Sequence, residues 1–233
     1  MALLSNTKKS ISALQLQKEL GHKRYEPIWA MLHKLRLVMR HRDTRYELKD
    51  HIELDDGFFE TADRSTSEEG SEKDNEANKR GRGSTRQAKM LVAVESKAVK
   101  NPKKGKKDKK VGYLKMTVMD DLKQIGVQYE VQKMINKNAT VLTDGYPSYS
   151  KLKEIVAKHE AVIVPDKSKV CKIFPWVHTA ISNAKRLLLG IHHSIKSTYL
   201  QNYLDEFCYK FNRRFLFNNL FDRLLIASVT NNR

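Results

Sequence analysis

The spacing of apolar residues changes along the chain. Between Ser10 and Met39, apolar residues recur at helical spacing with a break at Gly21, which predicts two amphipathic helices joined by a turn. Between residues 51 and 164, strand-like apolar runs are interspersed with amphipathic segments. From Val177 onward, apolar residues return to helical spacing. The pattern therefore predicts a helical start, an α/β middle and a mostly helical end.

The middle of the chain holds the elements that define the fold class. The predicted helices cover residues 122–135 and 149–159, and the predicted strands cover residues 51–59, 90–96, 113–121, 139–145 and 161–164. Three leading strands followed by alternating helices and strands are the order of the RNase H-like α/β arrangement. We therefore expect an RNase H-like mixed sheet flanked by helices over residues 49–233, preceded by a small helical segment over residues 1–48.

The helical start resembles a helix-turn-helix. Its second helix and the residues after it carry cations suited to phosphate contact or to entry of a recognition helix into a DNA groove, namely Lys34, Arg36, Arg40 and Arg42. The alternative is a basic helical hairpin that packs on the main domain. We expect residues 1–48 to bind DNA, because the chain as a whole is basic.

Charge narrows the class of partner. The formal net charge is +17, and such an excess indicates a polyanion, because Lys and Arg release condensed counterions when they contact phosphates. A membrane surface or ribosomal RNA would attract the same charge. Nucleic acid is the leading candidate.

Two charged segments, residues 60–89 and 97–110, are predicted to be flexible insertions. The first changes from acidic to basic after Asn78, and the second is basic throughout most of its length. A basic run is usually a solvated loop or a localisation signal, but two runs on either side of one strand favour arms that reach DNA phosphates. The residues expected to do so are Arg80, Arg82, Lys103, Lys104, Lys106 and Lys107.

Several other classes of protein are disfavoured. No apolar run approaches the ~18 residues that a membrane-spanning helix requires, and the N-terminus lacks the apolar stretch of a secretory signal. We therefore expect no membrane partner and a cytoplasmic protein. Cys171 and Cys208 are too few for a disulfide framework or a four-cysteine zinc site, so both are expected to be buried.

Two aspartates are candidates for metal-dependent phosphodiester chemistry. Asp55 lies inside the first predicted strand, and Asp144 lies at the carboxyl end of a later strand, where open α/β sheets place their sites. Gly145 allows a tight exit from that strand. The same residues also fit ordinary structural roles, because TDG followed by Tyr-Pro is common turn chemistry and a strand-end aspartate can simply be solvated. Spacing alone does not decide between these interpretations.

Four motifs in order extend the interpretation. IELDDGFF, VLTDGYPSY, WVHTAISNAKRLLLGIHH and YLQNYLDEFCYKFNRR together resemble bacterial insertion-sequence transposases of the family named for insertion sequence fifteen-ninety-five. The likeness extends from about residue 51 to residue 214. The segment SISALQLQKELGHKRYEPIWAMLHKLR is similar to the helical region that precedes the catalytic domain in this family.

This resemblance implies a DDE-type transposase of the branch in which Asn replaces the third acidic residue and a Lys follows it. By this likeness Asp55 and Asp144 bind metal, Asn183 is the third ligand through its amide oxygen, and Lys185 contacts phosphate; the adjacent Arg186 is expected to contact DNA. The likeness implies two Mg²⁺ or Mn²⁺ ions. A neutral carbonyl oxygen is an acceptable ligand for Mg²⁺, with some loss of affinity.

One geometric difficulty stays open. Asn183 and Lys185 are two residues apart on a predicted helix, and this spacing places them on different faces. Either the helix is irregular there, or Lys185 contacts DNA beside the metals. His178, at the start of the same helix, is another group that could reach the site.

The resemblance also implies partners. These are the terminal inverted repeats of an element and the target DNA, bound by a homo-oligomer in a synaptic complex within the bacterial cytoplasm, at the nucleoid. The alternatives are an RNase H-like nuclease without strand transfer and a catalytically inactive DNA-binding remnant. Many members begin with a Cys-rich zinc ribbon, whereas Met1 lies almost directly at the helical segment here. We therefore expect a copy shortened at its front, with impaired recognition of terminal repeats.

Overall fold

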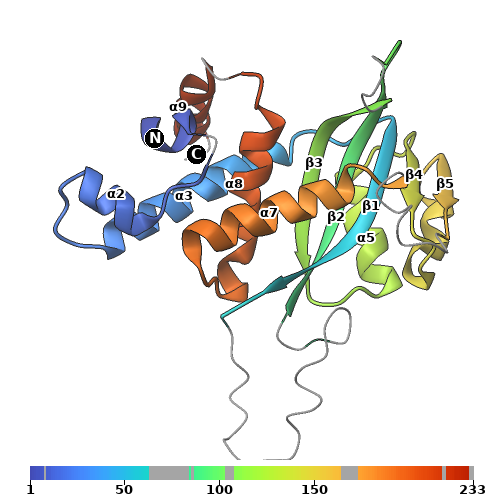
Figure 1. Cartoon of the computed structure of the whole chain (residues 1–233), viewed down its shortest axis with the longest axis horizontal. Helices are drawn as coiled ribbons and strands as arrows, with labels where there is room; N and C mark the ends of the chain where they lie inside the picture. Colours follow the sequence, from blue (N-terminus) through green and yellow to red (C-terminus); the bar gives the residue numbers. More distant parts are fainter. Residues whose placement is uncertain are drawn as a thin grey trace, which may run out of the picture. The chain divides into compact units, whose positions relative to one another are not determined.

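The structure is a computed structural model that describes residues 1–7, 9–62, 84, 87–102, 108–163, 173–216 and 219–230. It divides into two compact units (Figure 1). The sheet unit comprises residues 46–183, and the helical unit comprises residues 1–45 and 184–233. The expected division into residues 1–48 and 49–233 therefore differs from the structure at the C-terminal end, because residues 184–233 group with the N-terminal helices.

The sheet unit contains a five-stranded mixed sheet in the order β3-β2-β1-β4-β5. Strands β1, β2 and β3 pair antiparallel, whereas β1, β4 and β5 pair parallel. The elements are β1 (His51–Glu60), β2 (Gln87–Ala98), β3 (Lys109–Met119), α5 (Gln124–Met134), β4 (Thr140–Thr143), the 3₁₀ helix η2 (Pro147–Glu154) and β5 (Lys158–Ala161). The expected RNase H-like mixed sheet flanked by helices is confirmed.

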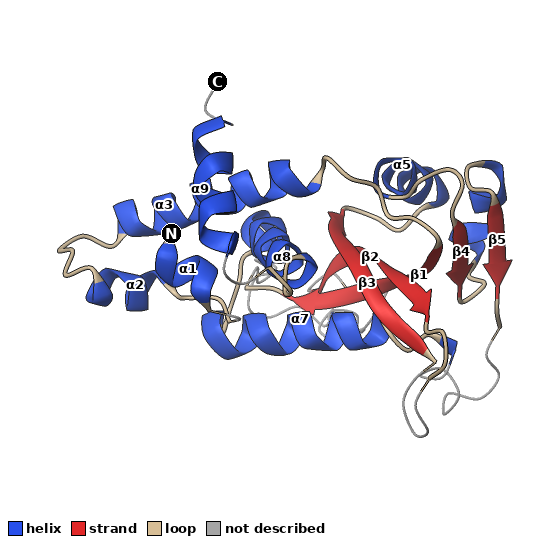
Figure 2. Ribbon diagram, turned by 90° about the horizontal axis from the view of Figure 1, so that it is seen from above, coloured by secondary structure: helices blue, strands red, loops and turns tan. Residues whose placement is uncertain are grey.

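One face of this sheet packs against α5 and η2 (Figure 2). Alternate residues of β1, Ile52 and Leu54, enter the same apolar core as Val127 and Val131 of α5. These two α5 residues are four apart, so they lie on one face of the helix. A strand with one set of alternate residues in this core presents the other set to the opposite face.

An irregularity in the pairing of β2 with β3 is filled by a buried acid. The register shifts between Val94 and Ser96, and Glu95 lies at the shift. Its carboxylate accepts hydrogen bonds from the backbone N–H groups of Lys49 and Tyr113, each at 3.0 Å. Gly112 is required beside it, because a Cβ atom there would lie 2.4 Å from Oε2 of Glu95.

The last predicted helix and strand differ from the structure. The helix expected over residues 149–159 is the shorter η2, and the strand expected over residues 161–164 is β5, which begins at Lys158. The apolar run misled the prediction, because Ile163 lies beyond β5 and is 80% exposed. Strand β5 is an edge strand that pairs with β4 in parallel, so pairing rather than burial fixes its position.

The helical unit contains the N-terminal helices, the second half of α7 and the two last helices that the structure describes. Its elements are α1 (Ala2–Asn6), α2 (Ala13–Glu19), α3 (Glu26–Asp43), α7 (Val177–His192, of which residues 184–192 belong to this unit), α8 (Ser197–Asn212) and α9 (Leu220–Thr230). The turn between α2 and α3 contains Gly21 at φ +62, so the predicted break between two helices is confirmed.

The core of the helical unit joins α3 to the end of the chain. Leu32 and Met39 of α3 pack in one apolar cluster with Tyr209 of α8 and Leu224 of α9. The predicted burial of Cys208 is confirmed, whereas Cys171 lies outside the described residues. Among the helices that the structure describes, none combines the length and apolar character needed to cross a membrane.

Candidate active site

The two neighbouring aspartates of β1 have different environments. Asp56 accepts a hydrogen bond from the hydroxyl of Tyr149 in η2, and it follows Leu54 on the face that packs against the core. Asp55 therefore lies on the opposite face, together with Glu53. Its Oδ1 accepts a hydrogen bond from the backbone N–H of Asp56 at 2.8 Å. The structure thus distinguishes a structural aspartate from a candidate catalytic one.

Parallel pairing of β1 with β4 brings the two predicted metal ligands into register. Glu53 is the partner of Leu142, so the same register carried two residues further places Asp55 opposite Asp144. Residues that are directly opposite in a sheet point to the same face. Asp144 immediately follows the last residue of β4, at the carboxyl end where α/β sheets hold their sites.

Asp144 also has the turn role that the sequence allowed. Its Oδ1 accepts a hydrogen bond from the backbone N–H of Tyr146 at 3.1 Å, and Gly145 between them has φ +79. A left-handed residue at this position favours glycine. The side chain of Asp144 is exposed. The hydrogen bond within the turn therefore holds Oδ1 of Asp144, and the carboxylate stays accessible to solvent.

Glu53 is a site residue that the sequence analysis missed. Its side chain is buried, and Oε2 accepts hydrogen bonds from the backbone N–H groups of Trp176 at 2.8 Å and Val177 at 3.0 Å. A carboxylate at the first N–H groups of a helix satisfies donors that have no partner within the helix, and it is stabilised by the helix dipole. Glu53 thereby holds the start of α7 against β1. The available signal was an acid between Ile52 and Leu54, in the middle of an apolar run.

This anchoring places His178 beside Asp55. Nδ1 of His178 lies 3.5 Å from Oδ2 of Asp55, and the ring meets Phe174 edge-on at 6.2 Å between centroids. Burial lowers the pKa of His178, and the negative charges of Glu53 and Asp144 oppose this shift. The imidazole is therefore predominantly neutral near pH 7.

Asn183 and Lys185 lie further along α7. Asn183 is exposed and comes five residues after His178, which is about 140° around an ideal helix. Lys185 is half-buried and comes seven residues after His178, close to two full turns, so it projects from nearly the same side of the helix. The expected roles of Asn183 and Lys185 stay predictions, and His178 is the α7 residue whose contact with Asp55 is observed.

The donor atoms fit a hard divalent cation in part. Asp55 and Asp144 offer carboxylate oxygens, which Mg²⁺ and Mn²⁺ prefer. Among the described residues, however, no group of three or more His, Cys, Asp or Glu side chains is placed to hold a metal ion. Asn183, the third ligand that the family resemblance implies, is an amide and so is not one of these side-chain types.

The predicted DNA contacts of α3 are corrected at one position. Arg36 is 1% exposed, and its Nε donates to Oε2 of Glu206 at 2.9 Å. It cannot reach a phosphate on the surface in this fold, so that prediction is wrong. Lys34 and Arg186 are exposed, and Arg40 is exposed with Nε 4.0 Å from Asp205. The remaining predicted contacts lie outside the described residues: Arg80, Arg82, Lys103, Lys104, Lys106 and Lys107.

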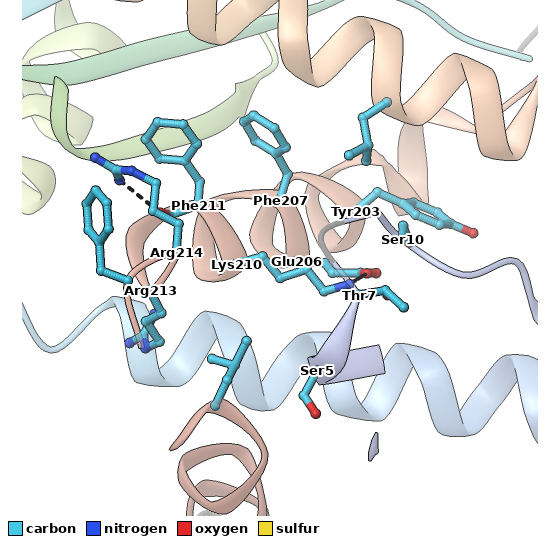
Figure 3. Close-up of a pocket in the computed structure, with 13 residues that line it drawn as sticks. Ser5, Thr7, Ser10, Tyr203, Glu206, Phe207, Lys210, Phe211, Arg213 and Arg214 are labelled. Atoms are coloured by element: carbon cyan, nitrogen blue, oxygen red, sulfur yellow. Dashed lines mark hydrogen bonds and ion pairs between the residues drawn. The ribbon is translucent and has the colours of Figure 1, made fainter. Parts of the chain in front are cut away.

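Glu206 also borders an apolar pocket within the helical unit. The pocket has a volume of about 370 Å³, and its lining combines aromatic rings such as Phe207, Phe211 and Phe215 with charged side chains. Figure 3 shows Glu206 and Lys210 pointing toward one another on α8, where Nζ of Lys210 lies 3.0 Å from Oε1 of Glu206. Glu206 thus lies between two cations.

Comparison with known proteins identifies the family. The family model of the ISXO2-like transposase domain, which is the DDE transposase domain of insertion sequence 1595, matches residues 47–212. No curated protein and no solved structure matches the chain. The matched residues include β1, β4 and α7, which carry Asp55, Asp144 and His178. Because the model covers more than half of the chain, the chain belongs to the ISXO2-like transposase family.

Proposed function

We propose that this protein cleaves DNA strands at the ends of a mobile element and joins them to target DNA, with Asp55 and Asp144 as metal ligands. The observation that carries the proposal is the parallel pairing of β1 with β4, whose register leads to Asp55 and Asp144 on one face of the sheet. The family match supports the same reaction class.

The chain's own residues would bind and orient the reacting groups. Two divalent ions, when bound, supply an activated oxygen nucleophile and stabilise the leaving oxygen. Asp55 and Asp144 would hold these ions through carboxylate oxygens. Glu53 fixes the first turn of α7, and His178 in that turn lies 3.5 Å from Asp55, so it would orient the carboxylate. DNA would be held by exposed cations such as Lys34, Arg40 and Arg186.

Plasmid nicking tests the metal-site assignment. Purified protein with Mg²⁺ or Mn²⁺ is expected to nick supercoiled DNA that carries its element's inverted repeats. Asp55→Asn and Asp144→Asn each remove a charged ligand, and we expect nicking to fall about a hundredfold or more while DNA binding remains. Asp56→Asn is the matched control, because Asp56 faces the opposite side and keeps an acceptor for Tyr149. Equal nicking by all three variants would exclude the assignment.

The third ligand needs a separate test. The observed contact with Asp55 is an argument for His178 as the third ligand, whereas the family resemblance favours Asn183. We expect Asn183→Ala to weaken Mn²⁺ binding, measured by calorimetry, more than His178→Ala does, because among the described residues no His, Cys, Asp or Glu side chain completes a set of three. The reverse order would assign the third ligand to His178. Products joined to a second DNA molecule would separate a transposase from a nuclease that cuts without strand transfer.

A second candidate function is DNA binding without catalysis. It is favoured by the turn role of Asp144, whose Oδ1 already accepts a hydrogen bond from the backbone N–H of Tyr146. A DNA-binding remnant would retain affinity for the element ends, and neither Mg²⁺ nor Mn²⁺ would induce nicking. Asp144→Asn would then have no effect on any measured property of the DNA complex.

A further inference from the structure

The helical unit contains a second pocket, of about 490 Å³, which we call the aromatic pocket. This volume lies within the roughly 300–1,000 Å³ of typical ligand sites. The pocket lies between the starts of α3 and α8 and the turn that joins α7 to α8. Its aromatic lining residues are Tyr25, Trp29, Tyr199 and Tyr203, with His192 beside them.

The aromatic side chains form one cluster. Trp29 and Tyr199 meet edge-to-face with ring centroids 5.0 Å apart, and His192 lies 4.5 Å from Tyr203. Tyr25 is 42% exposed and Tyr199 is 37% exposed, so both rings offer surface to a ligand. Rings held in this way present flat faces on which a planar group can stack.

The electrostatic surroundings favour an anion. No acidic side chain is among the described residues that line the aromatic pocket, whereas Lys196 and Arg36 are. Arg36 lies under the ring of Tyr203, with its guanidinium carbon 4.1 Å from the ring centroid. Arg36 and Lys210 flank the single carboxylate of Glu206, so these three side chains together carry one positive charge in excess. That charge acts through the field rather than by contact, since Arg36 is buried.

Two helix starts add to this field. Helix α3 begins after Tyr25 and α8 begins after Lys196, and neither of these N-cap residues caps its helix with a side-chain hydrogen bond. Both residues line the aromatic pocket. The first N–H groups of a helix favour a negative group such as phosphate. In α3, Pro27 lacks an N–H group and that of Ile28 donates to the carbonyl of Tyr25, so α8 contributes more than α3. Glu26 in the first turn of α3 is paired with Arg24 at 4.0 Å.

The histidines of the cluster do not change the sign of this field. Burial lowers the pKa of His192 to about 4, and the charge of Arg36 acts in the same direction. Burial also lowers the pKa of His33, which touches Trp29 and Tyr203, to about 4. Both rings are therefore neutral near pH 7. The neighbouring pocket in Figure 3 differs, because an acidic side chain, Glu206, lines it together with its cations.

From these observations we propose that the aromatic pocket receives a single unpaired nucleotide of DNA. The base stacks on the exposed ring of Tyr199, with Tyr25 and Trp29 lining the pocket beside it, and its phosphate lies toward Lys196 and the start of α8. This inference rests on the proposed function for the identity of the nucleic acid. It goes beyond that function because it assigns a binding site for an extrahelical base to the helical unit.

The test compares two DNA duplexes of equal length without divalent metal, so that no cleavage occurs. One duplex is fully paired, and the other carries one extrahelical thymine. We expect the wild-type protein to bind the second duplex about tenfold more tightly, because stacking of one base contributes on that order. Tyr199→Ala is expected to abolish this preference, and Tyr199→Phe, which keeps the ring, is expected to retain it.

Controls separate the possible failures. Tyr129→Ala, which changes a 58% exposed tyrosine on α5 of the sheet unit, is the matched control and should keep the preference. Tyr25→Ala repeats the test if Tyr199→Ala does not fold. Equal binding of both duplexes by the wild type, or an unchanged preference in Tyr199→Ala, contradicts nucleotide binding in the aromatic pocket. Neither result contradicts the proposed function. Binding of neither duplex contradicts the proposed function as well.

Discussion

The sheet unit and the helical unit both bury carboxylates, but they satisfy them differently. In the sheet unit, Glu53 and Glu95 accept hydrogen bonds from backbone N–H groups, and Glu95 has in addition one cation, Lys97, with Nζ at 3.2 Å. In the helical unit, Glu206 lies between the side-chain cations Arg36 and Lys210. A carboxylate held by the backbone fixes one element against another, whereas one held by cations neutralises charge inside a core. The exposed Asp144 neither fixes one element against another nor neutralises charge inside a core. This difference separates a candidate metal ligand from the structural acids.

The largest expected effect follows from removing charge at Glu206. Glu206→Gln leaves Arg36 and Lys210 as buried cations without a counterion, so we expect the free energy of unfolding to fall by about 3–5 kcal/mol. Urea denaturation measures this loss. The matched control is Glu160→Gln, which breaks a pair with Lys158 in which both side chains are exposed, and it should cost less than about 1 kcal/mol. Similar losses in both variants would contradict the expected difference between a buried carboxylate held by cations and an exposed ion pair.

Asp205 provides a pH-dependent test within the helical unit. Burial raises the pKa of Asp205 from 3.8 to about 7, against the hydrogen bond from Gln201. The folded state therefore binds a proton between pH 4 and 7 that the unfolded state has lost, so stability should fall as pH rises through this window. The slope contributed by Asp205 is at most about 1.4 kcal/mol per pH unit.

Asp205→Asn should remove that slope. Thermal unfolding at intervals from pH 4.5 to 7.5 checks this expectation, because the wild type and the variant should diverge most near neutral pH, where the variant is the more stable. Parallel curves over this range would show that Asp205 is ionised in the folded protein at all of these pH values.

Glu53→Ala tests the backbone-held carboxylates. The substitution leaves the N–H groups of Trp176 and Val177 without their acceptor, and we expect a loss of about 2 kcal/mol. Amide hydrogen exchange at these two positions should accelerate more than exchange in α5. If exchange in the first turn of α7 is unchanged, Glu53 does not anchor this helix.

Tyr149→Phe should have the smallest effect. It removes one hydrogen bond to Asp56 while it keeps the buried ring, so the free energy of unfolding should fall by about 1 kcal/mol. DNA nicking at a temperature well below unfolding should be unchanged. A large loss of nicking would place Asp56 in the reaction and would weaken the assignment of Asp55.

The sequence predicted the sheet better than the site. Apolar alternation located β1 within one residue at its end, and the order of elements predicted the mixed sheet. The predicted strand over residues 161–164 lay too far along the chain, because pairing with β4 decides the position of β5 and carries no local apolar signal. The grouping of α8 and α9 with α3 was also missed, because long-range packing such as that of Leu32 with Leu224 has no counterpart in local spacing.

At the site, spacing identified residues but not their environments. Asp55 and Asp144 could be proposed from strand ends, and the pairing of β1 with β4 then supported them. Charge counting failed at Arg36, because the residue that neutralises it lies 170 positions away at Glu206. The same limitation hid Glu53, whose hydrogen-bond donors are more than a hundred positions further along the chain. Sequence patterns therefore did not predict polar partners that lie far apart in the chain.

Gly112 has a consequence for which changes β3 can accept. Any residue with a Cβ atom at this position would press on the carboxylate of Glu95, whose oxygens accept hydrogen bonds from the backbone N–H groups of Lys49 and Tyr113. A single added methyl group would therefore loosen two separate segments of the sheet unit at once.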